Sequence, residues 1–486
     1  MDLANVGRQI QNDKDAGAIR SVLSQKREAL RCIEREMARL AENKRGIEED
    51  LVRLGAVLAP HMHSLVPNEV LSHIFVLLAL GHGPAEFPVP KDNAPPQFAV
   101  SHVSSRWRRV ALHTPELWND TYLIYPRNRL GHLLRLHQLW LIRARMLPVT
   151  LSIWFNKLSD SDELGVALQS ILFPVQIKRL SLRITYEQFI ALSTLPTMHL
   201  SEFELDVMFP FNHEDLSMND PHPLVTRLQS VTFRFKEPNL EALNWIDSLR
   251  PCLPWSQLRS LNFCIFVQDL HPIFGILRQT PMLEALALSI CRSAVLDPLL
   301  MPLLRTLAVN INLASFDNDN HTQVLRSFTC PSLTKFSLVT CGSWTREIPE
   351  ILKRQYNMQG LREFEFKGPF ALHVSSCLRN APMLHSLSLR PAVLDDEAVT
   401  GVSNGSLGRF LKKLEIQTKC DVGDLFAMVE ARKKMVDELL KNGCSWREGI
   451  TVLKDVVMIP SSKENLKGYK ERIILLKAAG IAITFL

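Results

Sequence analysis

Along residues 19–58 the apolar side chains recur in alternating steps of four and three residues. This spacing keeps one narrow stripe on a single side of a helix, as coiled coils require. We therefore predict one long helix in residues 1–60 that ends at Pro60, because proline breaks the helical hydrogen-bond pattern. Its stripe, called the seam below, consists of Ile19, Leu23, Lys26, Leu30, Ile33, Met37, Leu40, Lys44, Ile47, Leu51, Leu54 and Leu58.

The seam is apolar apart from its two lysines, so it needs a cover. The sequence leaves three alternatives open. A second copy of the chain could pair with it and form a homodimer, another helix of the same chain could cover it, or the helix could stand alone and partly exposed.

The later part of the chain repeats the pattern L-x-x-L-x-L ten times, with Phe, Ile or Val in place of some leucines. Positions four and six alternate with polar neighbours, so they point to one side of a short strand, and position one turns into the same core. The interval of about 26 residues matches the period of leucine-rich repeats, roughly 20–29 residues. The repeats begin at Ile177, Leu200, Leu228, Leu258, Leu283, Leu304, Leu333, Leu361, Leu384 and Leu411.

Some segments between these strands have helical spacing, as Leu270, Ile273, Phe274 and Leu277 do. The Asn or Cys that usually follows position six of a leucine-rich repeat is present in some repeats and absent from others; it falls on Cys291, Asn312 and Cys341. We therefore predict an α/β fold with an irregular solenoid of parallel strands over residues 145–424. Residues 425–486 would form a C-terminal cap that begins with a helix.

Residues 64–118 contain the pattern of a small helical module. Pro67 suits the first turn of a helix, and an apolar stripe follows it as far as Leu78. A loop rich in Gly and Pro is predicted over residues 81–97, and helical spacing returns between Val103 and Ala111. This module has more apolar surface than so few residues can hide, which favours a docking surface over the alternative of an ordinary core.

The same span resembles the F-box of mushroom-type fungal F-box proteins. The family pattern is Leu-Pro-x-Glu-x-Leu-x-x-Ile-Phe, then Val-Cys-x-x-Trp-Arg, then Pro-x-Leu-Trp. Here Val66 replaces the first Leu, Ser104 replaces the Cys, and the remaining landmarks are present.

The resemblance implies an all-helical module over residues 61–122 that binds the adaptor Skp1 and, through it, a cullin-RING ubiquitin ligase. It also implies which residues contact Skp1. These are Val66, Pro67, Val70, Leu71, Ile74, Phe75, Val103, Trp107, Arg108, Val110, Leu117 and Trp118.

Length and composition agree with a multi-domain or repeat protein. The 486 residues exceed the size at which single cores stop growing, and 46% apolar with 22% charged residues is ordinary for a globular protein. The net charge of +6 is mild, and we interpret the basic C-terminal region, which includes Arg432 and Lys434, as a solvated face and not a nucleic-acid site.

The nine cysteines are scattered singly, which is typical of reduced thiols in the cytoplasm or nucleus. The first residues contain no apolar signal segment, and no apolar run reaches the roughly 20 residues that span a bilayer. We therefore expect a cytoplasmic or nuclear protein that has no membrane partner.

Catalytic patterns are weak. Gly401, Gly405 and Gly408 lack phosphate-loop spacing, and His213-Glu214 does not continue into a zinc motif. His61 and His63 are a poor ligand pair, and the acidic run from Asp395 to Glu397 suits a helix start. We predict a non-enzyme without cofactor or metal.

Two functions remain. The first is a substrate-recognition subunit of an SCF-type (Skp1–cullin–F-box) ubiquitin ligase, with the repeats binding a target protein that the sequence does not identify. The alternative is a leucine-rich-repeat scaffold outside any ligase, whose box-like helices cap the solenoid and already bury Ile74, Phe75 and Trp107 in the monomer. Basic residues at repeat positions suit an acidic target or merely keep the surface soluble; they are Arg259, Arg305, Lys335, Arg362 and Lys412.

Overall fold

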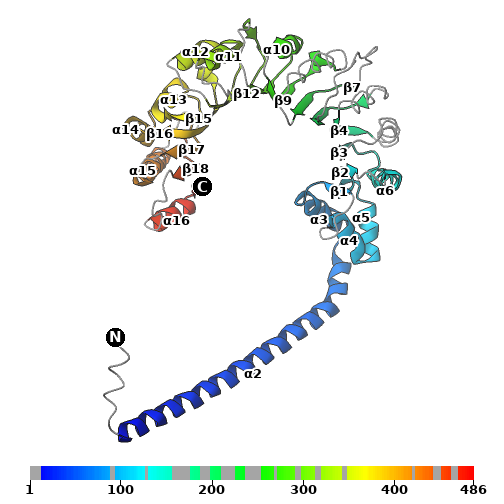
Figure 1. The fold of residues 1–486 in the computed structure, drawn as a ribbon, viewed down its shortest axis with the longest axis vertical. Coiled ribbons are helices and arrows are strands. Elements are labelled where there is room, and N and C mark those ends of the chain that lie inside the picture. Colours follow the sequence, from blue (N-terminus) through cyan, green and yellow to red (C-terminus); the bar gives the residue numbers. More distant parts are fainter. Residues whose placement is uncertain are drawn as a thin grey trace. The chain divides into compact units, whose positions relative to one another are not determined.

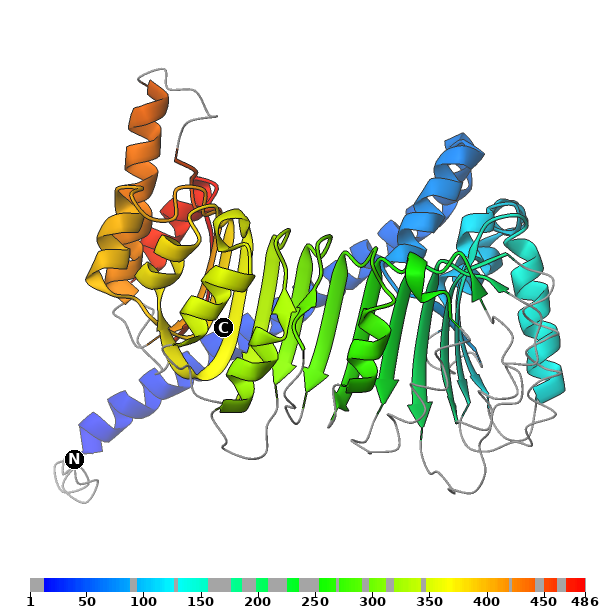
Figure 2. The same ribbon diagram turned by 90° about the horizontal axis from the view of Figure 1, so that it is seen from above.

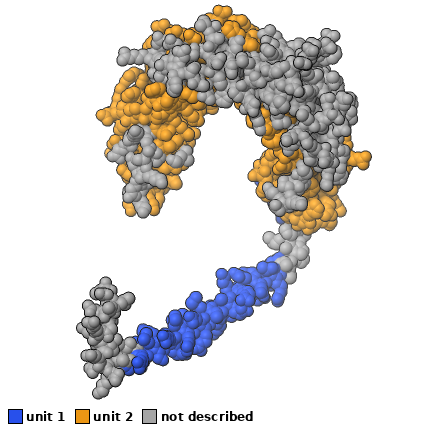
Figure 3. Space-filling view, in the orientation of Figure 1, with its two compact units in different colours: residues 1–77 blue, residues 78–486 orange. Residues whose placement is uncertain are grey.

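The structure is a computed structural model of residues 1–486. It describes residues 13–87, 94–125, 130–155, 176–185, 198–208, 225–235, 253–267, 271–290, 297–311, 319–341, 347–418, 422–441, 450–460 and 469–485. Several residues singled out in the sequence lie outside these ranges: His213, Glu214, Leu270, Cys291 and Asn312. The chain forms two compact units, residues 1–77 and residues 78–486 (Figure 3).

The described part of the first unit, from residue 13 on, consists of two helices, α2 (Asp13–Leu65) and most of α3 (Asn68–Leu80). The predicted long helix is confirmed, but its predicted end at Pro60 is wrong. Proline removes only one backbone donor, and the five residues after it contain no Gly or second Pro, so the helix continues to Leu65. Pro67 stands just before α3, and its carbonyl accepts a hydrogen bond from the Leu71 amide at 3.1 Å.

The second unit contains a parallel sheet of 15 strands that does not close on itself (Figures 1 and 2). Its strands, in spatial order, are β1 (Ala85–Phe87), β2 (Asp120–Tyr125), β3 (Val149–Phe155), β4 (Ile177–Thr185), β6 (Glu202–Met208), β8 (Ser230–Phe235), β9 (Ser260–Val267), β10 (Ala285–Ile290), β12 (Thr306–Ile311), β14 (Lys335–Thr340), β15 (Glu363–His373), β16 (Ser386–Val393), β17 (Lys413–Thr418), β18 (Asp455–Pro460) and β19 (Ala482–Phe485). Two short parallel pairs lie beside it: β5 (Met198–His199) with β7 (Val225–Thr226), and β11 (Leu299–Leu300) with β13 (Phe328–Thr329).

Each of the ten sequence repeats supplies one strand of this sheet, from β4 to β17. The fourth motif position is in register on successive strands, as Leu261, Leu286, Leu307 and Phe336 are on β9, β10, β12 and β14. These four side chains are buried. The predicted parallel strands with one inward apolar face are therefore confirmed.

The sheet extends beyond the predicted repeats in both directions. The module predicted to be all-helical contributes β1, which pairs with β2; both flanks of β1 are proline-rich, and an edge strand tolerates this because it needs ladder bonds on one side only. The predicted cap contributes β18 and β19. Leu453, Val456 and Met458 occupy motif positions one, four and six there, but Met at position six hid the repeat from the pattern.

Helices lie along one face of the sheet (Figures 1 and 2). Ile273, Phe274 and Leu277 are buried in α10, as their spacing predicts. Among the described residues, the helices of this unit after β1 are α4 (Pro96–Val103), α5 (Ser105–Leu112), α6 (Leu130–Arg143), α10 (His271–Leu277), α11 (Asp319–Arg326), α12 (Glu347–Gln355), α13 (Val374–Asn380), α14 (Asp396–Ser403), α15 (Val422–Lys441) and α16 (Lys470–Ala478), with 3-10 turns η1 (Pro115–Leu117), η2 (Trp255–Gln257) and η3 (Met358–Gly360).

Arg432, on α15, is fully buried, which corrects its placement on a solvated face. Its guanidinium donates hydrogen bonds to the carbonyl oxygens of Thr451 (2.8 Å), Val402 (3.0 Å), Gly408 (2.7 Å) and Arg409 (3.0 Å). Burial lowers the pKa of this guanidinium to about 10. One side chain thus ties α15 to the loop that precedes β17 and to the segment that precedes β18.

Replacing Arg432 with methionine should destabilise the second unit strongly. The Arg432→Met variant keeps an apolar stem but removes all four hydrogen bonds that the guanidinium donates. We expect the free energy of unfolding to fall by roughly 3 kcal/mol or more, measured by chemical denaturation. Lys434→Met, on the exposed side of the same helix, is the matched control and should change it by less than about 0.5 kcal/mol. Equal effects of the two substitutions would contradict this role of Arg432.

Candidate protein-interaction surfaces

Helix α3 has a buried side and an exposed apolar side. Phe75 is 1% exposed and Leu71 is also buried, whereas Ile74 is 47% exposed. Val70 and Leu77 are exposed as well, and the spacing 70, 74 and 77 places them on the same side of the helix as Ile74. An exposed apolar strip of this kind is typical of a surface that a partner covers.

Helices α4 and α5 meet at Ser104. Its hydroxyl oxygen accepts a hydrogen bond from the Trp107 amide at 3.1 Å, so Ser104 is the N-cap of α5. Ser104 therefore has a structural role at this position, and the general preference for Ser at N-caps was the available signal. Val103, just before the cap, and Arg108 are exposed, while Trp107 is half-buried.

Trp118 belongs to the core and not to the surface. It is 0% exposed, its indole Nε1 donates a hydrogen bond to the Ala111 carbonyl at 2.9 Å, and the Trp140 ring lies edge-on at 4.5 Å. The Arg143 guanidinium covers the indole ring at 4.7 Å. This cluster joins α5 to α6, so the last tryptophan of the motif holds the module together.

The twelve residues predicted to contact Skp1 therefore separate by position. Pro67, Val70, Ile74, Val103 and Arg108 are exposed, and Val66 and Trp107 are partly exposed. Because Leu71, Phe75, Val110, Leu117 and Trp118 are buried, they have no surface for a partner to contact in this conformation, and their predicted contact role is corrected to one in the core.

The face of the sheet away from the inward leucines, called the polar face, carries two networks of ion pairs. In the first, Glu204 on β6 accepts from Arg179 on β4 at 2.9 Å and pairs with Arg234 on β8 at 3.0 Å. Arg183 pairs with Asp206 on the same two strands, β4 and β6, at 3.5 Å. These charges therefore neutralise one another across three strands.

The second network lies on β14 to β17. Lys335 pairs with Glu363 at 2.7 Å, and Arg390 pairs with Glu415. Burial alone would raise the pKa of Glu365, but hydrogen bonds from Lys367 and Ser337 and two nearby positive charges lower it overall. Lys335, predicted as a cation for an acidic target, is thus already neutralised.

The strands between the two networks are uncharged on this face. Side chains of β9, β10 and β12 there are small or neutral: Ser260, Asn262, Ala285, Ala287, Thr306 and Ala308. The polar face as a whole therefore offers no large field of one sign.

Positive charge gathers instead at the amino ends of the strands. We call the exposed residues Lys178, Arg259, Arg305, Arg362, Lys412 and Lys454 the basic edge. Backbone hydrogen bonds join their positions from strand to strand, as from the Lys454 amide to the Lys412 carbonyl at 2.7 Å. Arg259 pairs with Glu284 at 3.0 Å, but within the described part of the chain Arg305, Arg362 and Lys412 have no ion pair.

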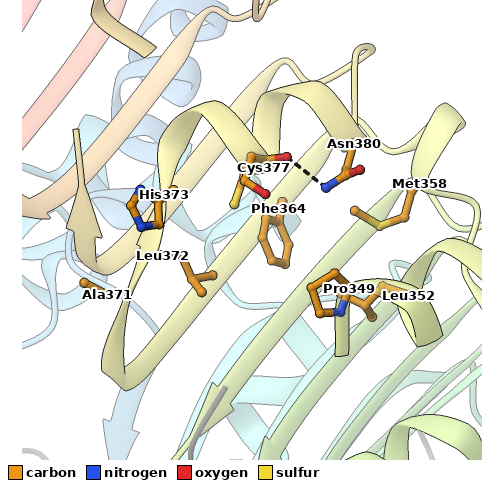
Figure 4. Close-up of a pocket in the computed structure, with 10 residues that line it drawn as sticks. Pro349, Leu352, Met358, Phe364, Ala371, Leu372, His373, Cys377 and Asn380 are labelled. Atoms are coloured by element: carbon orange, nitrogen blue, oxygen red, sulfur yellow. Dashed lines mark hydrogen bonds between the residues drawn. The ribbon is translucent and has the colours of Figure 1, made fainter. Parts of the chain in front are cut away.

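A small apolar cavity of about 150 Å³ lies between α12, β15 and α13 (Figure 4). Phe364, Leu352 and Met358 line it, and Cys377 faces it from α13. Burial raises the pKa of the Cys377 thiol to about 12, so this thiol stays protonated and is a poor nucleophile. The cavity has no group poised for chemistry.

The acidic run near this cavity is structural. Asp395 caps α14 by accepting a hydrogen bond from the Ala398 amide at 2.9 Å, as its predicted helix-start role requires. It also accepts from the Ser375 hydroxyl at 2.6 Å, and His373 lies 3.1 Å from it. Burial raises the pKa of Asp395, but the hydrogen bonds lower it overall. Since the Ser375 hydroxyl donates its hydrogen bond to the carboxylate and not to the histidine, the three do not form a nucleophilic triad.

Other candidate sites also have structural explanations. Gly405 and Gly408 have positive φ angles of 71° and 57°, which explains the glycine run, and His61 and His63 lie within α2. Among the described residues no group of three or more acidic, Cys or His side chains is arranged to hold a metal ion. Within the same residues, no helix has the length and apolar character required to cross a membrane.

Core and surface positions of the module should respond differently to truncation. Trp118→Ala should lower the free energy of unfolding by roughly 3–5 kcal/mol, because it empties a fully buried site. Val103→Ala, at an exposed position, should change it by less than about 0.5 kcal/mol. Urea denaturation of the two variants and the parent chain measures both, and a small effect at Trp118 would contradict the core assignment.

His137 should make stability depend on pH. It is fully buried, its Nε2 lies 3.1 Å from the Thr121 hydroxyl, and burial lowers its pKa from 6.5 to about 3. Between pH 6.5 and about pH 3 the unfolded chain therefore binds one more proton than the folded chain. As the pH falls through this range, the free energy of unfolding decreases by about 1.4 kcal/mol per pH unit. In His137→Gln this part of the loss between pH 7 and pH 5, about 2 kcal/mol, should disappear; an unchanged pH dependence would contradict it.

Comparison with known proteins leaves the family open. No protein-family model matches the chain, and no curated protein matches it. The likeness to F-box proteins thus rests on the motifs of residues 64–118, and the function is argued from the surfaces above.

Proposed function

We propose that this chain is the substrate-recognition subunit of an SCF-type ubiquitin ligase. The observation that carries the proposal is the exposed apolar strip Val70, Ile74 and Leu77 of α3, within a span that resembles an F-box. These side chains are about half exposed, so burying the rest of each under a partner would contribute roughly 1 kcal/mol. The strip therefore supplies part of the binding energy of the proposed docking site.

A second exposed group in the same span supports this assignment. Val103 ends α4 beside the Ser104 cap, and Arg108 is exposed on α5. A polar cap and a charged residue around an apolar contact are typical of the rim of a protein interface. The Skp1-type adaptor is proposed to contact these positions and the α3 strip.

The repeats are proposed to form an irregular leucine-rich-repeat solenoid that binds the target protein. Their period, their parallel strands and the helices along one face support this assignment. Apart from Arg259, the cations of the basic edge have no ion pair among the described residues, so the proposed target is acidic. The polar face, which is largely neutralised, would add hydrogen bonds and shape.

In this proposal the chain performs no bond chemistry itself. It holds the target near a ubiquitin-charged enzyme bound elsewhere in the complex, and this proximity converts a bimolecular step into one within an assembly. The compartments that suit this role are the cytoplasm and the nucleus.

The alternative is a repeat scaffold that joins no ligase. The burial of Phe75 favours it, because a box whose Phe is already covered serves as part of the chain's own core. The exposure of Ile74 favours the ligase, since a pure cap would cover that side chain too.

The direct test is binding of purified Skp1 to the full chain. We expect binding, and we expect Ile74→Glu to weaken it at least about tenfold, because a carboxylate would be desolvated in the interface. Ile142→Glu, at an exposed apolar position on α6, is the matched control and should bind like the parent chain. Isothermal titration calorimetry measures the three affinities.

Two results would overturn the ligase proposal. One is a parent chain that does not bind Skp1, which would leave the scaffold as the better explanation. The other is undiminished binding by Ile74→Glu, which would remove α3 from the interface. Circular dichroism of each variant ensures that a loss of binding is not a loss of fold.

A further inference from the structure

The seam of α2 remains exposed along its length. Its large apolar side chains are 50–66% exposed, from Leu23 to Leu54. Single exposed apolar residues are common and need no explanation, but a continuous stripe of this length does. Something must therefore cover it, and the charges on and beside the seam indicate what.

We propose that α2 pairs with α2 of a second copy of the chain in an antiparallel coiled coil. In this arrangement Leu23 faces Leu54 of the other copy, Leu30 faces Ile47, and Met37 faces Leu40. This interface is independent of the proposed ligase function.

The two seam lysines disfavour the parallel arrangement. In a parallel pair each seam residue meets its own copy, so Lys26 would face Lys26 and Lys44 would face Lys44. Two like charges would then be buried twice in a narrow apolar seam, and each ammonium would lose water without gaining a partner. The parallel dimer thus carries a penalty at two of its layers.

The antiparallel arrangement removes this penalty. Lys26 then faces Leu51 of the other copy, and Lys44 faces Ile33. A lysine stem packs on an apolar side chain while its ammonium reaches the edge of the seam. The ammonium of Lys44 already points that way, since it lies 3.7 Å from the Glu48 carboxylate of its own helix.

Register is fixed by the same residues. With the pairs given above, every seam residue from Ile19 to Leu58 has a partner, so the full length is used. Sliding one helix by seven residues in one direction would bring Lys26 opposite Lys44 and again bury two positive charges together. Sliding it by seven residues in the other direction would leave Ile19 and Leu23 without a seam partner, so both neighbouring registers are disfavoured.

Charges beside the seam agree with this direction. The seam residues Ile19 and Lys26 are each followed directly by a basic residue, Arg20 and Arg27. The seam residues Ile33 and Ile47 are each followed directly by an acidic one, Glu34 and Glu48. Antiparallel pairing brings Arg27 beside Glu48 of the other copy, twice by symmetry. Parallel pairing would place Arg27 beside Val22 and Glu48 beside Asn43, with no attraction. The complementarity is of the helix with itself, which selects a second copy over a foreign helix.

The consequence is a separation of the two docking strips. The paired 40 residues span about 60 Å at 1.5 Å per residue. Since α3 begins three residues after α2 ends, the two copies of α3 would begin at opposite ends of the coil.

The first experiment measures the mass of the full chain in solution by light scattering. We expect a dimer at micromolar concentration. Leu30→Glu combined with Ile47→Glu places carboxylates in facing layers and should weaken the dimer roughly hundredfold or more, giving a monomer. The matched control, Ala38→Glu with Val52→Glu, adds the same charges outside the seam and should stay dimeric. A monomeric parent chain, or a seam variant that stays dimeric, would overturn the proposal.

The second experiment fixes direction through disulfide formation, in a background with exposed Cys32 replaced (Cys32→Ser). Chains carrying Leu23→Cys are mixed with differently tagged chains carrying Leu54→Cys in a glutathione redox buffer. The antiparallel coil predicts a disulfide between the two tagged chains and none between two Leu23→Cys chains, whose thiols would lie about 46 Å apart. The parallel coil predicts the reverse, which would overturn the proposal. The Cys32→Ser chain without added cysteines gives the background of cross-links from other thiols.

Discussion

The dominant constraint in this structure is that a parallel strand can bury its inward leucines only beneath its neighbours. Each repeat covers the inward side chains of the next, so the core is continuous along the sheet and open at both ends. At the amino end the opening is closed by the aromatic cluster around Trp118 and Trp140. Toward the other end α15 packs beside α14, where Arg432 binds four carbonyl groups, and α16 packs against the last strand, β19. The proposed functions depend on this architecture, because it keeps one long face free of helices.

Sequence alone predicted the elements whose residues recur at a fixed period. The repeats revealed ten strands and their inward faces, and the heptads revealed α2, because each depends on local spacing that many residues share. Sequence analysis was wrong where the burial of a single residue depends on segments that are far away in the sequence. Nothing near Arg432 in sequence marks it as buried, since its acceptors lie more than 18 residues away. Trp118 is equally ambiguous, because a tryptophan suits a core as well as an interface.

The candidate docking module shows the same limit on a finer scale. Val70 and Leu71 are adjacent, as are Ile74 and Phe75, and the pattern of apolar residues is too broad to tell which of each pair faces water. Burial separates them: one residue of each pair is exposed and the other is covered. Cross-strand ion pairs are also hidden from sequence reasoning, since Lys335 and Glu363 are 28 positions apart although their strands are neighbours. What seemed a basic repeat face is therefore largely neutral, and the uncompensated charge lies at the basic edge.

The two lysines in the α2 seam lower the stability of the proposed coiled coil but specify its direction. Leucine at both positions would make a tighter coil in either orientation, whereas lysine penalises every arrangement that brings two of them together. The orientation that survives separates the two α3 strips by the length of the coil. Two docking modules at one end would compete for space, while modules at opposite ends can each hold a partner at once. A dimer of this form would then engage a multivalent target through two repeat arrays, and the gain in affinity would come from effective concentration without any new contact.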